Sequence, residues 1–273
     1  WAPMLLATLF LAPFVIKDFR RGKKKFSDIL VFLQLGALGA FPSQVLMTWG
    51  TQHSTASNAA IIVLSLPVIT AVFAFLILKE KMNGLRWLSF VIAIAGVLLI
   101  SMKDIRNMDL GSAYAMGNLL IFLAIIGNGY YNVGCKKIAD QYTEMEMVFY
   151  TYLVLVIMLT PLVLYYEPDV FAGIPSFTGK TWLGMASLTL FHNFLSMLLF
   201  FKVLKYLDAT QVAISNYMIT FLGLPIAALF LDETLSFPAI IGGILVLAST
   251  LILTILDSRG NRKIQVQTES IIK

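Results

Sequence analysis

The fold is decided by residues 55–80, which read TASNAAIIVLSLPVITAVFAFLILKE. The run 56–78 inside this stretch carries no charged residue and is apolar on every helical face. A helix that covers the core of a soluble protein would instead keep one polar face. A helix of about 20 residues crosses a bilayer, so this run predicts a transmembrane helix.

Runs of this kind recur along the whole chain of 273 residues. Hydrophobic residues make up 59% of it and charged residues only 13%, whereas an average soluble domain carries about 25% charge. Too little charge is present to coat a water-facing surface, so we expect an all-α integral membrane protein. Nine runs are predicted as transmembrane helices: 1–16, 29–50, 56–78, 85–102, 113–135, 145–166, 181–204, 210–231 and 238–256.

The basic residues test this count, because cytoplasmic loops of membrane proteins collect Lys and Arg. Nine spans place 17 of the 20 basic residues on one side, and Lys103, Arg106 and Lys180 on the other. This predicts a multi-pass protein of the cytoplasmic membrane, with the segment 17–28 and the C-terminus in the cytoplasm. The chain then starts on the outer side, and one further span before Trp1 would give ten spans with both ends inside.

A second stretch, residues 208–233, resembles residues 55–80 at a constant offset of 153 residues and reads DATQVAISNYMITFLGLPIAALFLDE. Both stretches begin with small and polar residues and end in a glutamate directly after the span, Glu80 and Glu233. The two ends are separated by five membrane crossings, which is an odd number. The copies must therefore lie upside down relative to each other, as in the inverted repeats of many secondary transporters.

These residues resemble the EamA repeat of the drug/metabolite transporter superfamily. The first half carries the resemblance in Thr55-Ala-Ser-Asn-Ala-Ala, Leu66-Pro67, Leu78-Lys79-Glu80 and Gly96-Val-Leu-Leu. The second half carries it in Asp208-Ala-Thr-Gln-Val-Ala, Leu231-Asp-Glu233 and Gly242-Gly243. The second copy departs from the first in one place, because Thr220 stands where the first copy has Pro67 and the proline falls at Pro225 instead.

The resemblance covers essentially the whole chain and implies two inverted five-helix repeats. Of the ten helices, nine would be present here and the first would be missing. The first repeat would occupy residues 1–112, the second residues 113–256, and a polar cytoplasmic tail residues 257–273. The resemblance also implies a central cavity and the export or exchange of amino acids or related metabolites by alternating access.

Neutral polar residues at mid-depth are the candidates for lining such a cavity, because an unsatisfied polar group in hydrocarbon is costly. The middle of each predicted span has no Asp, Glu, Lys or Arg, so hydrogen bonds rather than charge would hold a small polar solute. A hydrogen bond between two helices is the alternative role for any one of them. The candidates are Gln44, Thr48, Asn128, Tyr131, Asn132, His192, Asn193, Asn216 and Tyr217.

Three further features have more than one interpretation. His192 could also take up a proton during transport, since an imidazole titrates near neutral pH. Pro67 and Pro225 are hinge candidates, because a proline removes the backbone bond to the residue four before it, and a static kink is the alternative. Glu80 and Glu233 either begin the turns that follow their spans or act as gates at the two membrane faces.

Several other classes of protein fit poorly. The single cysteine, Cys135, excludes an intramolecular disulfide and a thiolate metal cluster, and we expect no metal and no cofactor. Gly179-Lys180-Thr181 resembles the end of a phosphate-binding loop, but the preceding glycine is one residue too far away. The basic residues lie only between apolar runs, a pattern that argues against nucleic acid as a partner. We therefore expect a transporter and no enzyme, with a small-molecule substrate and the lipid bilayer as partners.

Two alternatives to a metabolite transporter stay open. A nucleotide-sugar carrier of the same superfamily would need basic residues in its cavity for the phosphates. A polytopic enzyme acting on lipid would need clustered acids or metal ligands. The sequence leaves open the substrate, the direction of transport, the coupling ion and whether the chain forms a homodimer.

Overall fold

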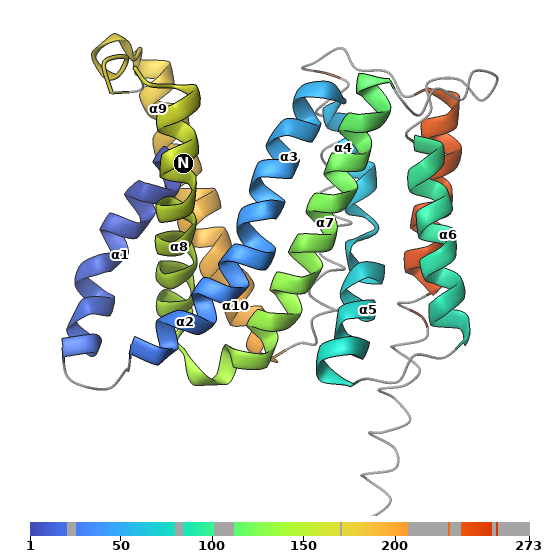
Figure 1. The fold of residues 1–273 in the computed structure, drawn as a ribbon, viewed down its shortest axis with the longest axis horizontal. Helices are drawn as coiled ribbons and strands as arrows, with labels where there is room; N and C mark the ends of the chain where they lie inside the picture. The colour runs from blue at the N-terminus through green and yellow to red at the C-terminus, as the bar shows by residue number, and fades with distance from the viewer. Residues whose placement is uncertain are drawn as a thin grey trace, which may run out of the picture. The chain divides into compact units, whose positions relative to one another are not determined.

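The computed structural model shows a helical protein (Figure 1). It describes residues 1–20, 26–79, 84–100, 112–169, 171–206, 229, 236–252 and 255, and for 17–20 and 26–28 only the helical backbone. Within these ranges every regular element is a helix. Five spans are long and apolar enough to cross a membrane: Ile29–His53, Ala56–Leu78, Ala113–Gln141, Glu144–Tyr166 and Gly179–Tyr206. Shorter apolar helices cover Ala2–Ile16, Gly84–Ile100 and Phe237–Ile252.

These helices confirm the expectation of an all-α membrane protein. Where the predicted spans fall on described residues, a helix lies there, and its ends differ from the predicted ones by a few residues. The predicted span 210–231 lies outside the described residues, and so do Glu80 and Glu233. The number of spans and the inverted repeat therefore stay predictions.

The chain divides into two compact units, and each unit contains segments of both predicted repeats. Unit 1 consists of Trp1–Pro42 and Gly134–Asp208, and unit 2 consists of Ser43–Val133 and Ala209–Lys273. The helices of unit 1 are α1 (Ala2–Arg20), α2 (Phe26–Leu35), η1 (Gly36–Ala40), η2 (Ala139–Gln141), α8 (Glu144–Tyr166), η3 (Ile174–Ser176), α9 (Gly179–Ser187), η4 (Leu188–Ser196) and α10 (Met197–Tyr206). Those wholly or mostly in unit 2 are α3 (Phe41–His53), α4 (Ala56–Val63), α5 (Leu66–Leu78), α6 (Gly84–Ile100), α7 (Ala113–Ile138) and the Phe237–Ile252 helix.

In unit 1, α8 is the central helix, and α1, α2, η1 and α10 all pack against it. Phe32 of α2 is fully buried, with its ring centroid 4.9 Å from that of Tyr142 and 5.1 Å from that of Tyr150. Gly36 of η1 lies directly against Val154 of α8, leaving no room for a side chain. In addition, α1 packs on η4.

In unit 2, close glycine contacts let helix backbones touch. A Cβ atom at Gly96 of α6 would lie only 2.7 Å from the carbonyl oxygen of Gly242, so α6 and the Phe237–Ile252 helix meet backbone to backbone (Figure 1, teal and orange). Gly50 of α3 and Gly117 of α7 meet in the same way, with 2.8 Å from either Cβ position to the other's carbonyl oxygen. Such contacts between small residues are typical of membrane helices, which gain little from the hydrophobic effect.

Two kinds of interruption divide the long spans. The span Ala56–Leu78 breaks at Leu64 and Ser65, where the amides of both residues bond to the carbonyls three residues before, at 3.1 and 2.9 Å. Pro67 follows as one of the first residues of α5, where its missing N–H costs nothing. Thr250 of the last described helix donates its hydroxyl to the carbonyl of Leu64 at 2.8 Å.

The second kind of interruption is π-helical. In η1, the amide of Phe41 bonds to the carbonyl of Gly36, five residues before, and Pro42 follows at once, where its ring would clash with a regular helical carbonyl. In η4, the side-chain amide of Asn193 donates to the carbonyl of Leu188 at 3.0 Å, again five residues before. Proline and glycine account for η1, whereas an asparagine side chain supports η4.

Candidate functional site

At one end of unit 2, buried and half-buried polar side chains join four helix ends. This amide cluster consists of Ser54, Asn58, Tyr114 and Asn118. It lies where α3 ends, α4 begins, α6 ends and α7 begins. The Thr55 hydroxyl caps α4 by accepting from the backbone amide of Asn58 at 3.1 Å. This cap fixes the start of α4, from which the Asn58 side chain reaches α7.

Asn118 is the centre of the amide cluster, and no part of it is exposed. Its side-chain oxygen accepts from the Ser54 hydroxyl and, at 3.5 Å, from the Asn58 amide, which also donates to the Tyr114 hydroxyl. Its amide nitrogen donates to the carbonyl of Ile100 at 3.1 Å, which is one of the end carbonyls that α6 cannot pair internally. The cluster is neutral throughout and satisfies polar groups that a dry environment would leave unpaired.

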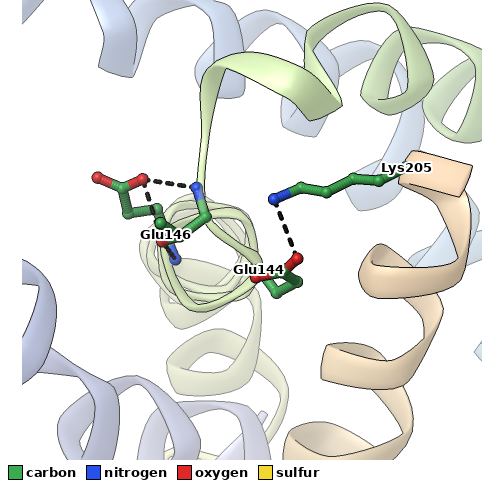
Figure 2. A network of polar contacts seen from close by, with 4 residues as sticks. Glu144, Glu146 and Lys205 are labelled. Carbon is green, nitrogen blue, oxygen red and sulfur yellow. Dashed lines mark hydrogen bonds and ion pairs between the residues drawn. The ribbon is translucent and has the colours of Figure 1, made fainter.

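At one end of unit 1, a charged cluster holds the last turn of α10. This ionic cluster consists of Lys136, Glu144 and Lys205. The Lys136 ammonium donates to the carbonyls of Leu204 and Lys205 at 2.8 and 3.2 Å. Lys205 in turn pairs with Glu144 at 3.0 Å (Figure 2). A cation at a helix C-terminus and a carboxylate at a helix N-terminus both match the helix dipoles.

Glu146, two residues further along α8, has a different role. Its carboxylate accepts from the Thr143 amide at 2.7 Å, while the Thr143 hydroxyl accepts from the Glu146 amide at 3.3 Å (Figure 2). This is a capping box that starts α8. Glu144 and Glu146 therefore lie in the same turn: Glu144 pairs with Lys205 of α10, and Glu146 caps the helix in which it lies.

The residues predicted to line a cavity fall in both units. In unit 2, Gln44 and Thr48 are exposed on α3, Asn128 is half-buried, and Tyr131 and Asn132 are buried, all three on α7. Because α7 is helical throughout, these last three residues share one stripe, as their spacing predicted. In unit 1, His192 is exposed, whereas Asn193 is 4% exposed and its side-chain oxygen has no partner among the described contacts.

Convergence of these residues on one cavity stays a prediction. Asn216, Tyr217 and the hinge candidate Pro225 lie outside the described residues. The other hinge candidate, Pro67, follows directly after the break in its span, but whether the span moves there is likewise untested.

Both clusters were missed from the sequence. Tyr114 and Asn118 are four residues apart, hence on one face of α7, and the predicted topology places the end of the second span beside the start of the fifth. That combination is the signal that could have found the amide cluster. Within the described ranges, no group of three His, Cys, Asp or Glu residues could hold a metal ion.

Comparison with known proteins points to one family. The chain is 22% identical to the uncharacterized transporter YetK of Bacillus subtilis, over 88% of this chain and 70% of that protein. It is 23% identical to a probable terminal-alkyne amino-acid exporter of Streptantibioticus cattleyicolor, over 83% of this chain and 73% of that protein. A solved crystal structure shares the fold, with a TM-score of 0.61 and 16% identity over 94% of this chain and 88% of the other.

The sequence pattern of the EamA-like transporter family matches residues 1–102 and 115–255, which is nearly the whole chain. The relatives are transporters rather than enzymes, and the long apolar helices are those of a multi-pass membrane protein. The chain therefore belongs to the EamA-like transporter family.

Proposed function

We propose that this protein is a secondary transporter that moves a small neutral or zwitterionic metabolite, of the amino-acid class, across the cytoplasmic membrane by alternating access. The observation that carries the substrate class is the neutrality of every polar side chain in the middle of the predicted spans. With no charge there to offset an ion, a site in the membrane must bind its solute through hydrogen bonds. The named activity of the S. cattleyicolor relative, amino-acid export, supports the same class.

The residues assigned to substrate binding are the neutral polar residues of the spans. Asn128, Tyr131 and Asn132 of α7 provide amide and hydroxyl groups on one stripe. In η4, His192 provides an imidazole, and Asn193 provides an amide oxygen that has no partner among the described residues. π-Helical segments occur frequently at functional sites. Gln44, Thr48, Asn216 and Tyr217 complete the set.

The inverted repeat is part of the proposal, and the π-helical segments support it. Adding the sequence offset of 153 to the bounds of η1 gives 189–193, which falls inside η4 (Leu188–Ser196). Within unit 1, each π-helical segment packs on the helix that precedes the span of the other one. The helix before the η1 span, α1, packs on η4, and the helix before the η4 span, α8, packs on η1. A two-fold axis that exchanges the two repeats would turn each of these two contacts into the other.

The contact between α6 and the Phe237–Ile252 helix supports the same symmetry in unit 2. Gly96 faces Gly242. The offset of 153 turns this pair into Ser249 and Ser89, and both serines are fully buried. Each serine bonds to a carbonyl of its own helix, Ser89 to that of Leu85 at 3.0 Å and Ser249 to that of Val246 at 2.6 Å, so small side chains stand at the equivalent positions of both helices.

The proposed orientation places the C-terminus and the segment 17–28 in the cytoplasm, as the distribution of basic residues predicts. A Ser27→Cys variant, with Cys135 replaced by Ser, should not react with a membrane-impermeant thiol reagent in intact cells. The same variant should react fully once the membrane is permeabilised. Efficient labelling of intact cells would show that the orientation is reversed.

Substrate counterflow in proteoliposomes tests the function. Vesicles loaded with one unlabelled zwitterionic amino acid at a time should take up a trace of the same labelled amino acid, whereas protein-free vesicles should not. His192→Ala and Asn216→Ala should reduce this uptake sharply. Phe191→Ala, an exposed neighbour of His192, is the control and should transport normally. If uptake is seen only with strongly charged solutes, or if both variants transport normally, the proposed site is wrong.

A further inference from the structure

The span Gly179–Tyr206 lies inside unit 1, with charged contacts at its C-terminal end and a π-helix in its middle. The ionic cluster holds its last turn: Lys136 donates to two of its carbonyls, and Lys205 pairs with Glu144. Lys136 lies in the last turn of α7 and Glu144 in the first turn of α8, on either side of the α7–α8 turn. Among the described contacts, the hydrogen bonds and the ion pair at the end of α10 thus all join it to the residues on either side of the α7–α8 turn.

The middle of the same span is η4, nine residues of π-helix. A π-helix is less favourable than an α-helix and is rarely this long. Here it also leaves the buried oxygen of Asn193 without a partner among the described contacts, which adds to its cost. Because the π-helical conformation is high in free energy, η4 can change to another helical conformation with little further increase in free energy. We therefore expect this span to bend at η4.

The ionic cluster has a strength that suits repeated opening. The side chains of Lys205 and Glu144 are 20% and 31% exposed, so water reaches the pair if it lies at the cytoplasmic face, as the proposed orientation places it. Ion pairs of this kind are weak, and their contribution falls with added salt. A buried, neutral cluster would hold the helix end more tightly and would not release it within a transport cycle.

We propose that α10 is a gate arm that pivots at η4, and that the ionic cluster is the latch that holds its end against the α7–α8 turn. The proposal rests on the proposed function, because opening and closing of one membrane face is a step of alternating access. With the proposed orientation, the latch lies at the cytoplasmic face. Releasing the latch frees that end of α10 and leaves α9 in place.

Distances between spin labels in reconstituted protein test the latch. Lys137→Cys on α7 and Tyr206→Cys at the end of α10 are both exposed, and Cys135→Ser removes the native thiol. The wild-type latch should give mainly the short distance of this structure. Glu144→Gln should raise the ratio of long to short distances about threefold, and Lys136→Met about tenfold.

Two controls separate a latch from a general disturbance. Glu146→Gln removes the same charge from the same turn but keeps the capping box, because Gln also serves in it, and it should leave the distances unchanged. Labels at Tyr166→Cys and Leu183→Cys, on α8 and α9, should show the same distance in every variant. Equal shifts in Glu144→Gln and Glu146→Gln, or a change between α8 and α9, would overturn the proposal.

Salt provides an independent measurement on the labelled protein with the latch intact. Raising the salt from 0.05 to 0.5 M, chosen as roughly a threefold change in screening length, should shift the ratio in the same direction as Glu144→Gln. It should have little further effect in Glu144→Gln itself. An unchanged ratio in the intact protein would show that the cluster is a static cap.

Failure of the latch and failure of the proposed function give different results. If the protein shows amino-acid counterflow but its distances do not respond to Glu144→Gln, Lys136→Met or salt, transport stands and the latch is wrong. If the distances respond but no zwitterionic amino acid exchanges, the latch stands and the substrate class is wrong.

Discussion

The amide cluster and the ionic cluster both tie the end of a long span to the neighbouring helices, but they use opposite chemistry. The amide cluster ties the end of α3 through neutral groups, and its central residue Asn118 is fully buried. The ionic cluster ties the end of α10 through charged groups that are partly exposed. In the proposed inverted repeat, α3 and α10 are equivalent segments. Equivalent positions would then carry one neutral connection and one charged connection that salt should weaken.

The largest expected effect is at the centre of the amide cluster. Asn118→Leu leaves the Ser54 hydroxyl, the Asn58 amide and the Ile100 carbonyl without their buried partner, and should lower the free energy of unfolding by about 3 kcal/mol. Unfolding by SDS in mixed micelles measures this, read out by thiol labelling of the buried Cys135. Met116→Leu, an exposed change two residues earlier, is the control. A cost below about 1 kcal/mol would contradict a stabilising role for the cluster.

The next effect concerns the backbone contact beside the amide cluster. Gly117→Ala places a methyl group 2.8 Å from the carbonyl oxygen of Gly50, so α3 and α7 must move apart, at a cost of about 2 kcal/mol. Gly184→Ala, where nothing lies within 4 Å, should instead be neutral or stabilise by up to about 1 kcal/mol, because Ala favours helix over Gly. Equal effects in the same unfolding assay would show that the two helices do not touch here.

Lys136→Met should have a smaller effect on stability, about 1–2 kcal/mol, because two end carbonyls of α10 lose a charged donor. Lys137→Met, at the exposed neighbour, serves as the control and should change stability little. A larger loss than that of Asn118→Leu would reverse the comparison between the two clusters.

The smallest effect is expected at the ion pair. Glu144→Gln should cost about 0.5 kcal/mol at low salt, and this cost should become smaller as the salt is raised to 0.5 M, where the screening length is about 4 Å. The loss in Asn118→Leu should not change with salt, because no charge is involved. A double variant of both should show additive losses. A salt-independent cost at Glu144 would remove the difference between the clusters.

The spans of this protein could be predicted from its sequence because bilayer thickness fixes the length of an apolar run. The run 56–78, for example, matches the observed span Ala56–Leu78. Its division at Leu64 and Ser65 was foreseen only as a kink at Pro67. The division depends on which carbonyls find other partners, and the partner here, Thr250, is 186 residues away.

The functional features were harder to predict than the spans. No residue type marks η4 as π-helical in the sequence, because a π-helix differs from an α-helix only in which carbonyl each amide reaches. His192 and Asn193 were selected as mid-span polar residues, yet neither identifies η4 as a π-helix. The amide and ionic clusters join residues that are far apart in sequence, such as Ser54 with Asn118. From the sequence, the members of each cluster are linked only because the predicted topology places them at the same membrane face.

The hydrogen bond from Thr250 to Leu64 has a consequence for the biosynthesis of the protein. A chain is synthesised at about 5–20 residues per second, so the 186 residues between these partners require about 10–40 s. Throughout that time the Leu64 carbonyl is already in the nascent chain, while the hydroxyl that finally bonds to it has not yet been made. The division between α4 and α5 is therefore completed only after the ribosome has produced the last described helix. A ribosome that stalls before Thr250 would leave this span without its final form.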